Sequence, residues 1–203
     1  MDPFTTHTGI AAPLRLTNVD TDQLVPARFG IRTTRTGWAD ALLADKRSDP
    51  DFVLNHPVHR TATILLAGSD FGTGSSREMA VWALLDHGFR AVVAPRYGDI
   101  FRGNALKNGL PAVTLAPHEM ERLWELVERE PTCPVTVDLE RSEVRGGDLR
   151  FGFTLDDHSR WRLLNGVDDI ALTLRHSDAI DRYERGRRHT LPTTRPRGEA
   201  GAR

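Results

Sequence analysis

The sequence contains little cysteine, almost no net charge and no long hydrophobic run. Cys133 is the one cysteine among 203 residues, so the chain by itself can form no internal disulfide and cannot hold an iron–sulfur cluster. The 27 lysine and arginine residues balance 28 aspartate and glutamate residues, leaving a net charge of -1 and no electrostatic basis for binding nucleic acid or a membrane surface. The apolar stretches are far shorter than the roughly 20 residues of a spanning helix. No signal peptide is recognisable, so we expect a cytoplasmic location.

The length of the chain is sufficient for a core of its own. A chain of 203 residues buries roughly 70% of the surface that its unfolded form exposes, so it needs neither disulfides nor a structural metal to fold. We therefore expect one soluble domain.

Helical and extended patterns alternate through the first two thirds of the chain. Apolar, β-rich runs predict strands over residues 9–16, 61–67, 91–94 and 112–115, and the segments between and after them predict helices over 77–87, 95–108 and 117–129. Such alternation is typical of a parallel α/β layer.

A β-rich part is predicted to follow this layer. Residues 134–139 and 149–155 are predicted to form a hairpin about the Gly146-Gly147 turn, and residues 160–164 a third strand. A last helical stretch begins at Asn165-Gly166. The fold class expected is therefore α/β, a single domain with a parallel α/β layer and a β-rich part.

Two segments lack a clear apolar period. Residues 27–60 form a polar, irregular stretch that is long for a connection in a compact domain, and such loops tend to be functional or disordered. Residues 187–203 are rich in arginine, proline and glycine and predict a disordered basic tail. Nucleic-acid binding by this tail is the less favoured interpretation.

The strongest local signal is the sequence from Gly72 to Arg77, at a strand-to-helix junction. Its glycines allow a ligand to approach the backbone, and two hydroxyl groups and a guanidinium meet the exposed N–H groups of a helix N-terminus. This combination predicts an anion-binding site. In the alternative interpretation, Ser75 or Ser76 merely caps the helix, Glu78 completes a capping box, and Arg77 is a surface charge.

Other polar residues give weaker signals. Asp20 and Asp22 could offer carboxylates to a cation, but turn formation and capping by Asn18 and Asp20 is the favoured interpretation. His56 and His59 could be metal ligands, although the proline between them indicates a loop in which both face solvent. Cys133 has no basic neighbour and is interpreted as a structural or incidental thiol.

Four blocks of the sequence, in order and at compatible spacing, resemble one known family. They are residues 18–26 (NVDTDQLVP), 68–78 (GSDFGTGSSRE), 99–101 with 107–110 (DIF and KNGL) and 164–170 (LNGVDDI), and residues 51–55 (DFVLN) also fit. Between about residue 8 and residue 186 the chain resembles the small subunit of bacterial 3-isopropylmalate dehydratase, the detached swivelling domain of the aconitase superfamily. The resemblance implies a β/β/α swivelling domain over residues 1–186.

The resemblance also implies an activity and a partner. It implies a heteromeric hydro-lyase of leucine biosynthesis that dehydrates and rehydrates isopropylmalate, a dicarboxylate, with a large subunit that binds the [4Fe-4S] cluster, while this chain binds no metal. It further implies that Ser75 is the base that removes a proton next to a carboxylate, and that Gly74, Ser76 and Arg77 bind substrate. Asp20, Thr21 and Asp22 are expected to support that site.

The family associates substrate choice with the loop after the Asp-Thr-Asp segment. In this chain the candidates are Phe29, Ile31, Arg32, Thr33 and Arg35. An isopropyl group calls for an apolar contact, whereas an extra carboxylate calls for an arginine. Because the loop offers both, it does not decide the substrate.

The sequence departs from the family pattern in several places. Thr73, Met79 and Val81 replace the usual cysteine, histidine and proline, and Arg96-Tyr97 and Gly103 replace the usual Ser-Phe and Asn. A paralogous subunit acting on another alkylmalate or a citrate-like acid therefore stays open, as does a non-catalytic regulatory subunit that keeps the fold.

Overall fold

The computed structural model describes residues 1–188, 190 and 192, and the chain divides into two compact units. The first unit is Met1–Asp168 and the second begins at Asp169. The domain boundary predicted at residue 186 stays a prediction, and most of the predicted tail, 187–203, lies outside the described residues. No helix in the described part is long and apolar enough to cross a membrane.

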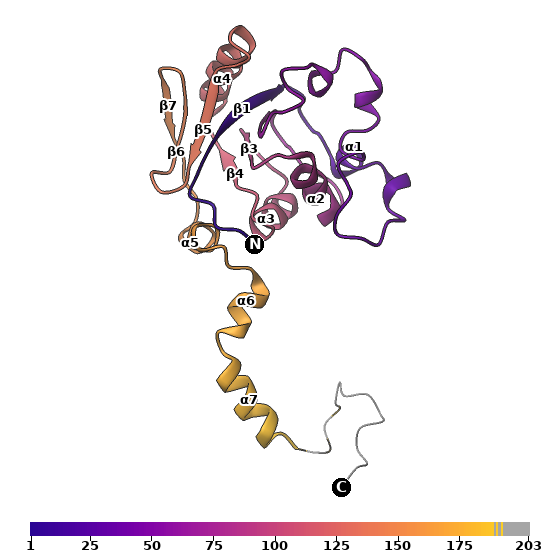
Figure 1. The fold of residues 1–203 in the computed structure, drawn as a ribbon, viewed down its shortest axis with the longest axis vertical. Coiled ribbons are helices and arrows are strands. Elements are labelled where there is room, and N and C mark those ends of the chain that lie inside the picture. Colours follow the sequence, from indigo (N-terminus) through magenta and orange to yellow (C-terminus); the bar gives the residue numbers. More distant parts are fainter. Residues whose placement is uncertain (189, 191, 193–203) are drawn as a thin grey trace. The chain divides into compact units, whose positions relative to one another are not determined.

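A single seven-stranded sheet forms the centre of the first unit, as far as the described residues show (Figure 1). Its strands, in spatial order, are β4 (Ala112–Thr114), β3 (Ala91–Ala94), β2 (Ile64–Ala67), β1 (Thr6–Leu14), β5 (Pro134–Asp138), β6 (Glu143–Gly146) and β7 (Leu149–Gly152). Strands β1 to β4 are parallel, whereas β5 to β7 continue the sheet in antiparallel pairs. The predicted parallel layer and β-rich part are thus two halves of one sheet, joined at β1.

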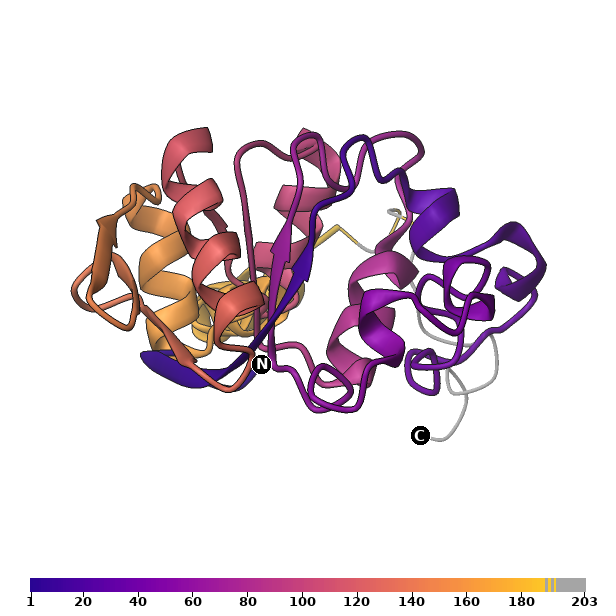
Figure 2. The ribbon, with the colours of Figure 1, turned by 90° about the horizontal axis from the view of Figure 1, so that it is seen from above.

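Helices lie on both faces of the sheet. They are α1 (Thr21–Leu24), α2 (Glu78–His87), α3 (Asp99–Lys107), α4 (Pro117–Arg129) and α5 (Asp157–Asn165), and Figure 2 shows α2 and α4 on opposite sides of the strands. Strands β2 and β3 are buried at every position, as expected for parallel strands covered on both faces. One apolar cluster packs α2 against the sheet, and a second packs α4 against the other face.

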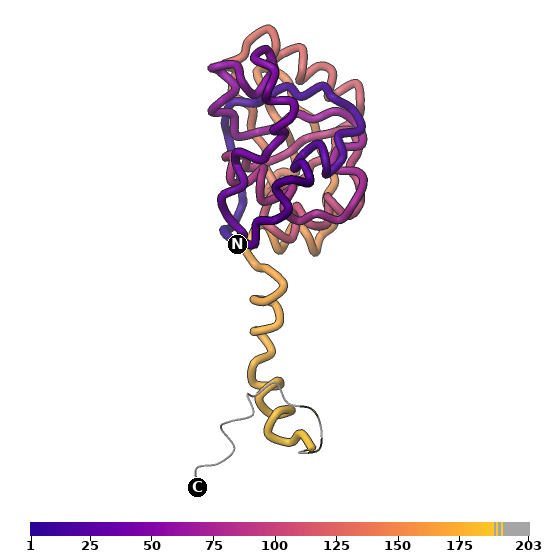
Figure 3. Tube along the Cα trace, turned by 90° about the vertical axis from the view of Figure 1, so that its right-hand side faces the viewer, coloured from indigo at the N-terminus to yellow at the C-terminus, as the bar shows by residue number. Residues whose placement is uncertain are grey.

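The described residues of the second unit include the short helices α6 (Asp169–Leu174) and α7 (Ser177–Gly186). Their turns can be followed in the Cα trace of Figure 3. They confirm the helical stretch predicted after Asn165-Gly166.

Residues 160–164 are helical, so the prediction of a strand there is wrong. They belong to α5, which Asp156 begins by accepting a hydrogen bond from the backbone N–H of Ser159 at 2.8 Å. Gly166 ends the helix in the left-handed conformation, at φ +64°. The capping residues, Asp156 and Gly166, are ten positions apart. They favour a helix in this segment more strongly than the short apolar run between them favours a strand.

The long segment 27–60 is an ordered covering layer rather than an open loop. It contains the 3₁₀ turns 27–29, 46–48 and 53–55. Trp38, Leu42, Leu43 and Leu54 are fully or almost fully buried and join the cluster around α2. His59 is also buried, with 7% of its surface exposed, which corrects the expectation that it faces solvent. His56 is exposed as predicted.

Three histidines in partly or fully buried positions make stability depend on pH. Burial lowers the pKa of His7, His59 and His87, helped by the charges of Arg90, His56 and Arg47 respectively. The unfolded chain then binds protons at higher pH than the folded chain, so stability falls as the pH drops below about 6.5. We expect a lower melting temperature at about pH 5.5 than at about pH 7.5, by roughly 2–4 °C for each 1 kcal/mol lost.

Thermal melts of the wild-type chain and two variants test this prediction. His87→Leu should weaken the pH dependence, whereas His118→Leu, at an exposed position on α4, should leave it intact. A melting temperature that stays constant between these pH values would contradict it.

Candidate functional site

The glycine-rich segment 68–77, which we call the Ser75 loop, leaves the carboxyl end of β2 and enters α2. In α/β sheets, ligands bind beyond the carboxyl ends of parallel strands. The loop packs tightly at Gly72, where φ is +76° and an added Cβ would lie 2.2 Å from the ring of Phe101. Gly72 is therefore required both by its backbone conformation and by close packing on α3.

Backbone hydrogen bonds hold the Ser75 loop on two sides. On one side it pairs with residues 19–21, which lead into α1: Gly72 N–H donates to Val19 O at 2.7 Å, and Thr21 N–H donates to Thr73 O at 3.0 Å. On the other side it pairs with the segment after β3, where Phe71 N–H donates to Arg96 O at 3.1 Å. The loop is thus fixed between two chain segments that are distant in sequence.

Ser75 and Ser76 are exposed at the end of this fixed loop. The hydroxyl group of Thr21, itself almost fully buried, donates to the backbone carbonyl of Ser75 at 2.9 Å. Ser75 therefore has an exposed side chain, while its backbone carbonyl is held by a buried residue. Arg77 is the N-cap residue of α2 and no side chain caps the helix, so the alternative interpretation of Ser75 or Ser76 as the cap is wrong.

Arg77 forms an ion pair with Asp22, which lies in the first turn of α1. The Arg77 side chain is 23% exposed, so its guanidinium is partly shielded from water. Asp20 caps α1 by accepting from Gln23 N–H at 2.7 Å, as the capping interpretation predicted. Burial alone would raise the pKa of Asp20, but hydrogen bonds from Gln23 and the charge of Arg77 lower it overall.

The chemistry available at the Ser75 loop is anion binding next to a hydroxyl group. Ser75 and Ser76 directly precede Arg77, the N-cap residue of α2, so two exposed serines, a guanidinium and the positive end of the α2 dipole belong to one short stretch of the chain. Gly74 keeps this stretch without a side chain at φ +88°. Carboxylate groups of a small ligand suit such a site.

A second ion pair at this loop was not foreseen from the sequence. Arg96 pairs with Asp70, and the hydrogen bond from Arg96 lowers the pKa of that carboxyl group. In the sequence, Arg96 stands out only as a departure from the family pattern. Its pairing could not be predicted, because it depends on β3 lying next to β2.

The residues predicted to select the substrate form what we call the Ile31 loop, residues 29–36. Arg32 donates to Asp40 at 2.8 and 2.7 Å and lies over the ring of Phe29. Arg35 donates to Asn108 Oδ1 at 2.8 Å. Ile31, in contrast, is 87% exposed.

The structure therefore separates these candidates into two groups. Both arginines are engaged in contacts within the chain, and Phe29 is half-buried against the core. Ile31 and Thr33 remain exposed. The exposed apolar group of the loop is Ile31.

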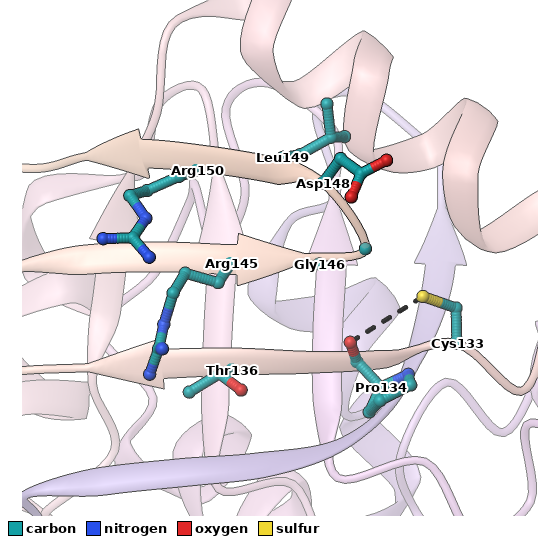
Figure 4. Close-up of a pocket in the computed structure, with 9 residues that line it drawn as sticks. Cys133, Pro134, Thr136, Arg145, Gly146, Asp148, Leu149 and Arg150 are labelled. Atoms are coloured by element: carbon teal, nitrogen blue, oxygen red, sulfur yellow. Dashed lines mark hydrogen bonds between the residues drawn. The ribbon is translucent and has the colours of Figure 1, made fainter.

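The described residues do not suit an iron–sulfur cluster or another metal. They contain no group of three or more histidine, cysteine, aspartate or glutamate side chains that could hold an ion. Cys133 lies outside the Ser75 loop, on the segment that leads into β5, where its sulfur is 3.9 Å from Pro134 O. Cys133 is among the residues that line a surface pocket of about 510 Å³, and Figure 4 shows it next to Pro134, at the opposite end from the side chains of Arg145 and Arg150.

Models of known families match three segments of the chain. A model described as the aconitase C-terminal domain matches residues 1–118, and one described as LeuD_N matches residues 121–157. A model of the C-terminal domain of the 3-isopropylmalate dehydratase small subunit matches residues 169–197. The first match covers the Ser75 loop and the Ile31 loop, and it confirms the predicted aconitase-type α/β fold class.

Curated relatives are similar over almost the whole chain. The 3-isopropylmalate dehydratase small subunit of Acidothermus cellulolyticus is 61% identical over 195 residues, 96% of this chain and 99% of the relative. That of Thermobifida fusca is 58% identical over 96% of this chain and 100% of the relative. The crystal structure of 3-isopropylmalate dehydratase from Methanocaldococcus jannaschii shares the fold, with a TM-score of 0.66 and 23% identity over 88% of this chain and 99% of the other.

Proposed function

The chain belongs to the 3-isopropylmalate dehydratase small-subunit family, and from this premise we propose that its Ser75 loop binds isopropylmalate and moves the proton during dehydration and rehydration. The enzyme is a hydro-lyase of the aconitase family that serves leucine biosynthesis. One observation carries the proposal. An exposed serine and a partly shielded arginine stand together at the start of α2, on a loop bonded from both sides.

Ser75 is the base in this proposal. Its Oγ removes the proton from the carbon next to a substrate carboxylate and returns a proton during rehydration. A serine alkoxide needs stabilising charge at neutral pH, and the α2 dipole and Arg77 supply it. The hydrogen bond from Thr21 to the Ser75 carbonyl limits movement of the base without engaging its hydroxyl.

Gly74, Ser76 and Arg77 bind the substrate carboxylate. Arg77 offers a planar fork of donors that matches a carboxylate, and its ion pair with Asp22 orients the guanidinium. Asp20 and Thr21 act behind the loop, through the cap of α1 and the bond to the Ser75 carbonyl.

The small-subunit assignment implies a large-subunit partner. We assign the family's [4Fe-4S] cluster to that partner, because the described residues of this chain offer no matching donor set. The assembly proposed is a heteromer of the two chains in the cytoplasm. The site is then completed only where the large subunit meets the Ser75 loop.

The substrate is proposed to be isopropylmalate rather than a tricarboxylic acid. Arg32 donates to both carboxylate oxygens of Asp40 and Arg35 donates one bond to Asn108, so in this proposal both arginines serve contacts within the chain and not an extra carboxylate. Ile31 presents an apolar group that suits an isopropyl substituent.

Anaerobic reconstitution with the cognate, cluster-loaded large subunit tests the proposed function. The complex should form the unsaturated diacid from 2-isopropylmalate with a higher kcat/KM than from citrate or shorter alkylmalates. Turnover of another acid alone would show a paralogous enzyme. Absence of turnover by a fully loaded complex would support a regulatory subunit.

Ile31 provides a direct test of substrate selection. Ile31→Ala should lower kcat/KM for isopropylmalate by roughly 5- to 50-fold, the value of one apolar contact. The melting temperature should not change, because an exposed side chain contributes little to the core. Thr33→Ala, an exposed change in the same loop, serves as the control. If both variants had the same kcat/KM, Ile31 would not be part of the substrate-binding site.

A further inference from the structure

Asn108 uses every hydrogen-bonding position of its side chain. It follows the last residue of α3, and its Oδ1 accepts from Arg35 Nη2 at 2.8 Å and from Trp82 Nε1 at 3.2 Å. Its Nδ2 donates to Glu78 Oε1 at 2.7 Å and to Asn104 O at 2.9 Å. A primary amide has two donors and two acceptor lone pairs, so all four are occupied.

These four bonds join three separate chain segments. Arg35 belongs to the Ile31 loop, whereas Glu78 and Trp82 lie on one face of α2, one turn apart. Glu78 directly follows Arg77, at the point where the Ser75 loop becomes helix. The guanidinium of Arg35 also lies over the Trp82 ring, 5.7 Å from its centre.

We propose that Asn108 is a positioning residue that keeps the Ile31 loop and the Ser75 loop in a fixed position relative to each other. It acts through two arms, the bond to Arg35 that holds the Ile31 loop and the bond to Glu78 that holds the start of α2. This inference rests on the proposed function. It adds that Asn108 holds both loops of the proposed site. One loop carries Ile31, which contacts the alkyl substituent, and the other carries the residues that bind and deprotonate the substrate.

The surroundings of Asn108 favour positioning over a contribution to stability. Arg35 and Glu78 are exposed, and Asn108, Arg35 and Trp82 line a surface pocket of about 330 Å³. Water can therefore replace the lost bonds when Asn108 is truncated, which keeps the energetic cost small. Water cannot maintain the fixed distance between two loops, and small displacements of reacting groups reduce turnover strongly.

The two arms predict different kinetic effects in the reconstituted enzyme. Arg35→Ala breaks the first arm and should raise KM for isopropylmalate about 5- to 20-fold with little change in kcat. Asn108→Asp keeps the acceptor for Arg35 but faces Glu78 with a like charge, and should lower kcat about tenfold. Asn108→Ala breaks both arms and should change both constants. The size of these effects follows from the misplacement of bound groups.

Restoring the second arm provides a rescue. In the double variant Asn108→Asp with Glu78→Gln, the new amide donates to the new carboxylate and removes the like charges, so kcat should recover most of its loss. Asn165→Ala is the matched control, because Asn165 also stands at a helix end and donates to the carbonyl four residues earlier, at 2.8 Å. This control should keep wild-type kinetics.

The outcomes separate this inference from the proposed function. Wild-type turnover, with Asn108→Ala and Asn108→Asp equal to wild type, would overturn the positioning role alone. A kcat loss in Asn108→Asp that the Glu78→Gln change does not relieve would also overturn it. If Asn108→Ala fails to fold, Arg35→Ala and Asn108→Asp, with and without Glu78→Gln, still test the positioning role. Absence of turnover by the wild-type complex would overturn both claims.

Discussion

Replacing Ser75 by alanine is expected to lower kcat of the reconstituted enzyme by about 10²–10⁴-fold, the usual contribution of a general base. The Ser75 side chain is exposed, and the bond that Thr21 makes to this residue runs to its backbone carbonyl. The substitution should therefore leave the loop, the melting temperature and the affinity for the large subunit unchanged. Loss of activity without loss of structure is the signature of a group that acts on the substrate.

A second site serine and a control serine sharpen this prediction. Ser76→Ala should weaken substrate binding and raise KM more than it lowers kcat, because Ser76 is proposed to contact a carboxylate. Ser48→Ala, at an exposed position in a 3₁₀ turn outside the site, should have no effect. Turnover by Ser75→Ala close to the wild-type rate would show that another group is the base.

Replacing Arg77 should cost about 2–5 kcal/mol of transition-state binding, which is roughly a 30- to 5,000-fold loss in kcat/KM. The guanidinium is partly shielded and held by Asp22, so it meets a substrate carboxylate already oriented. Arg77→Lys keeps the charge but not the fork of donors, and should recover only part of the loss seen in Arg77→Ala. Steady-state kinetics of the two variants measure the difference.

Variants of Asp22 and of Arg129, an arginine outside the site, are compared with the Arg77 variants. Asp22→Asn should lower kcat/KM less than Arg77→Ala, because it removes the support and not the ligand. Arg129→Lys, in an ion pair on the exposed face of α4, should leave kinetics unchanged. A similar small loss in Arg77→Ala and Arg129→Lys would mean that Arg77 is a surface charge.

The strands and helices around the Ser75 loop could be predicted because their signals are local. Continuous apolar runs at β2 and β3, glycines before α2 and Gly88 after it mark the boundaries within a few neighbouring residues. The sequence predicts a strand at α5 for the opposite reason. Its apolar residues resemble a short strand, and the decisive caps lie at its two ends.

The contacts that hold the candidate site could not be predicted from the sequence. Thr21 and Ser75 are 54 residues apart, and Arg35 and Asn108 are 73 residues apart. No periodicity or spacing links such pairs, because they meet through the order of strands in the sheet. The burial of His59 has the same origin, since the covering layer 27–60 folds onto a core that its polar sequence does not reveal.

In the proposed enzyme, this chain completes an active site that the large subunit does not form alone. The most direct measurement is an anaerobic titration of the chain into a fixed amount of cluster-loaded large subunit, followed by formation of the unsaturated diacid from 2-isopropylmalate. We predict negligible activity without the chain, a rise to a plateau as it is added, and no rise when the Ser75→Ala chain is added instead. Full activity of the large subunit alone, or an equal rise with Ser75→Ala, would show that this chain does not supply the catalytic base.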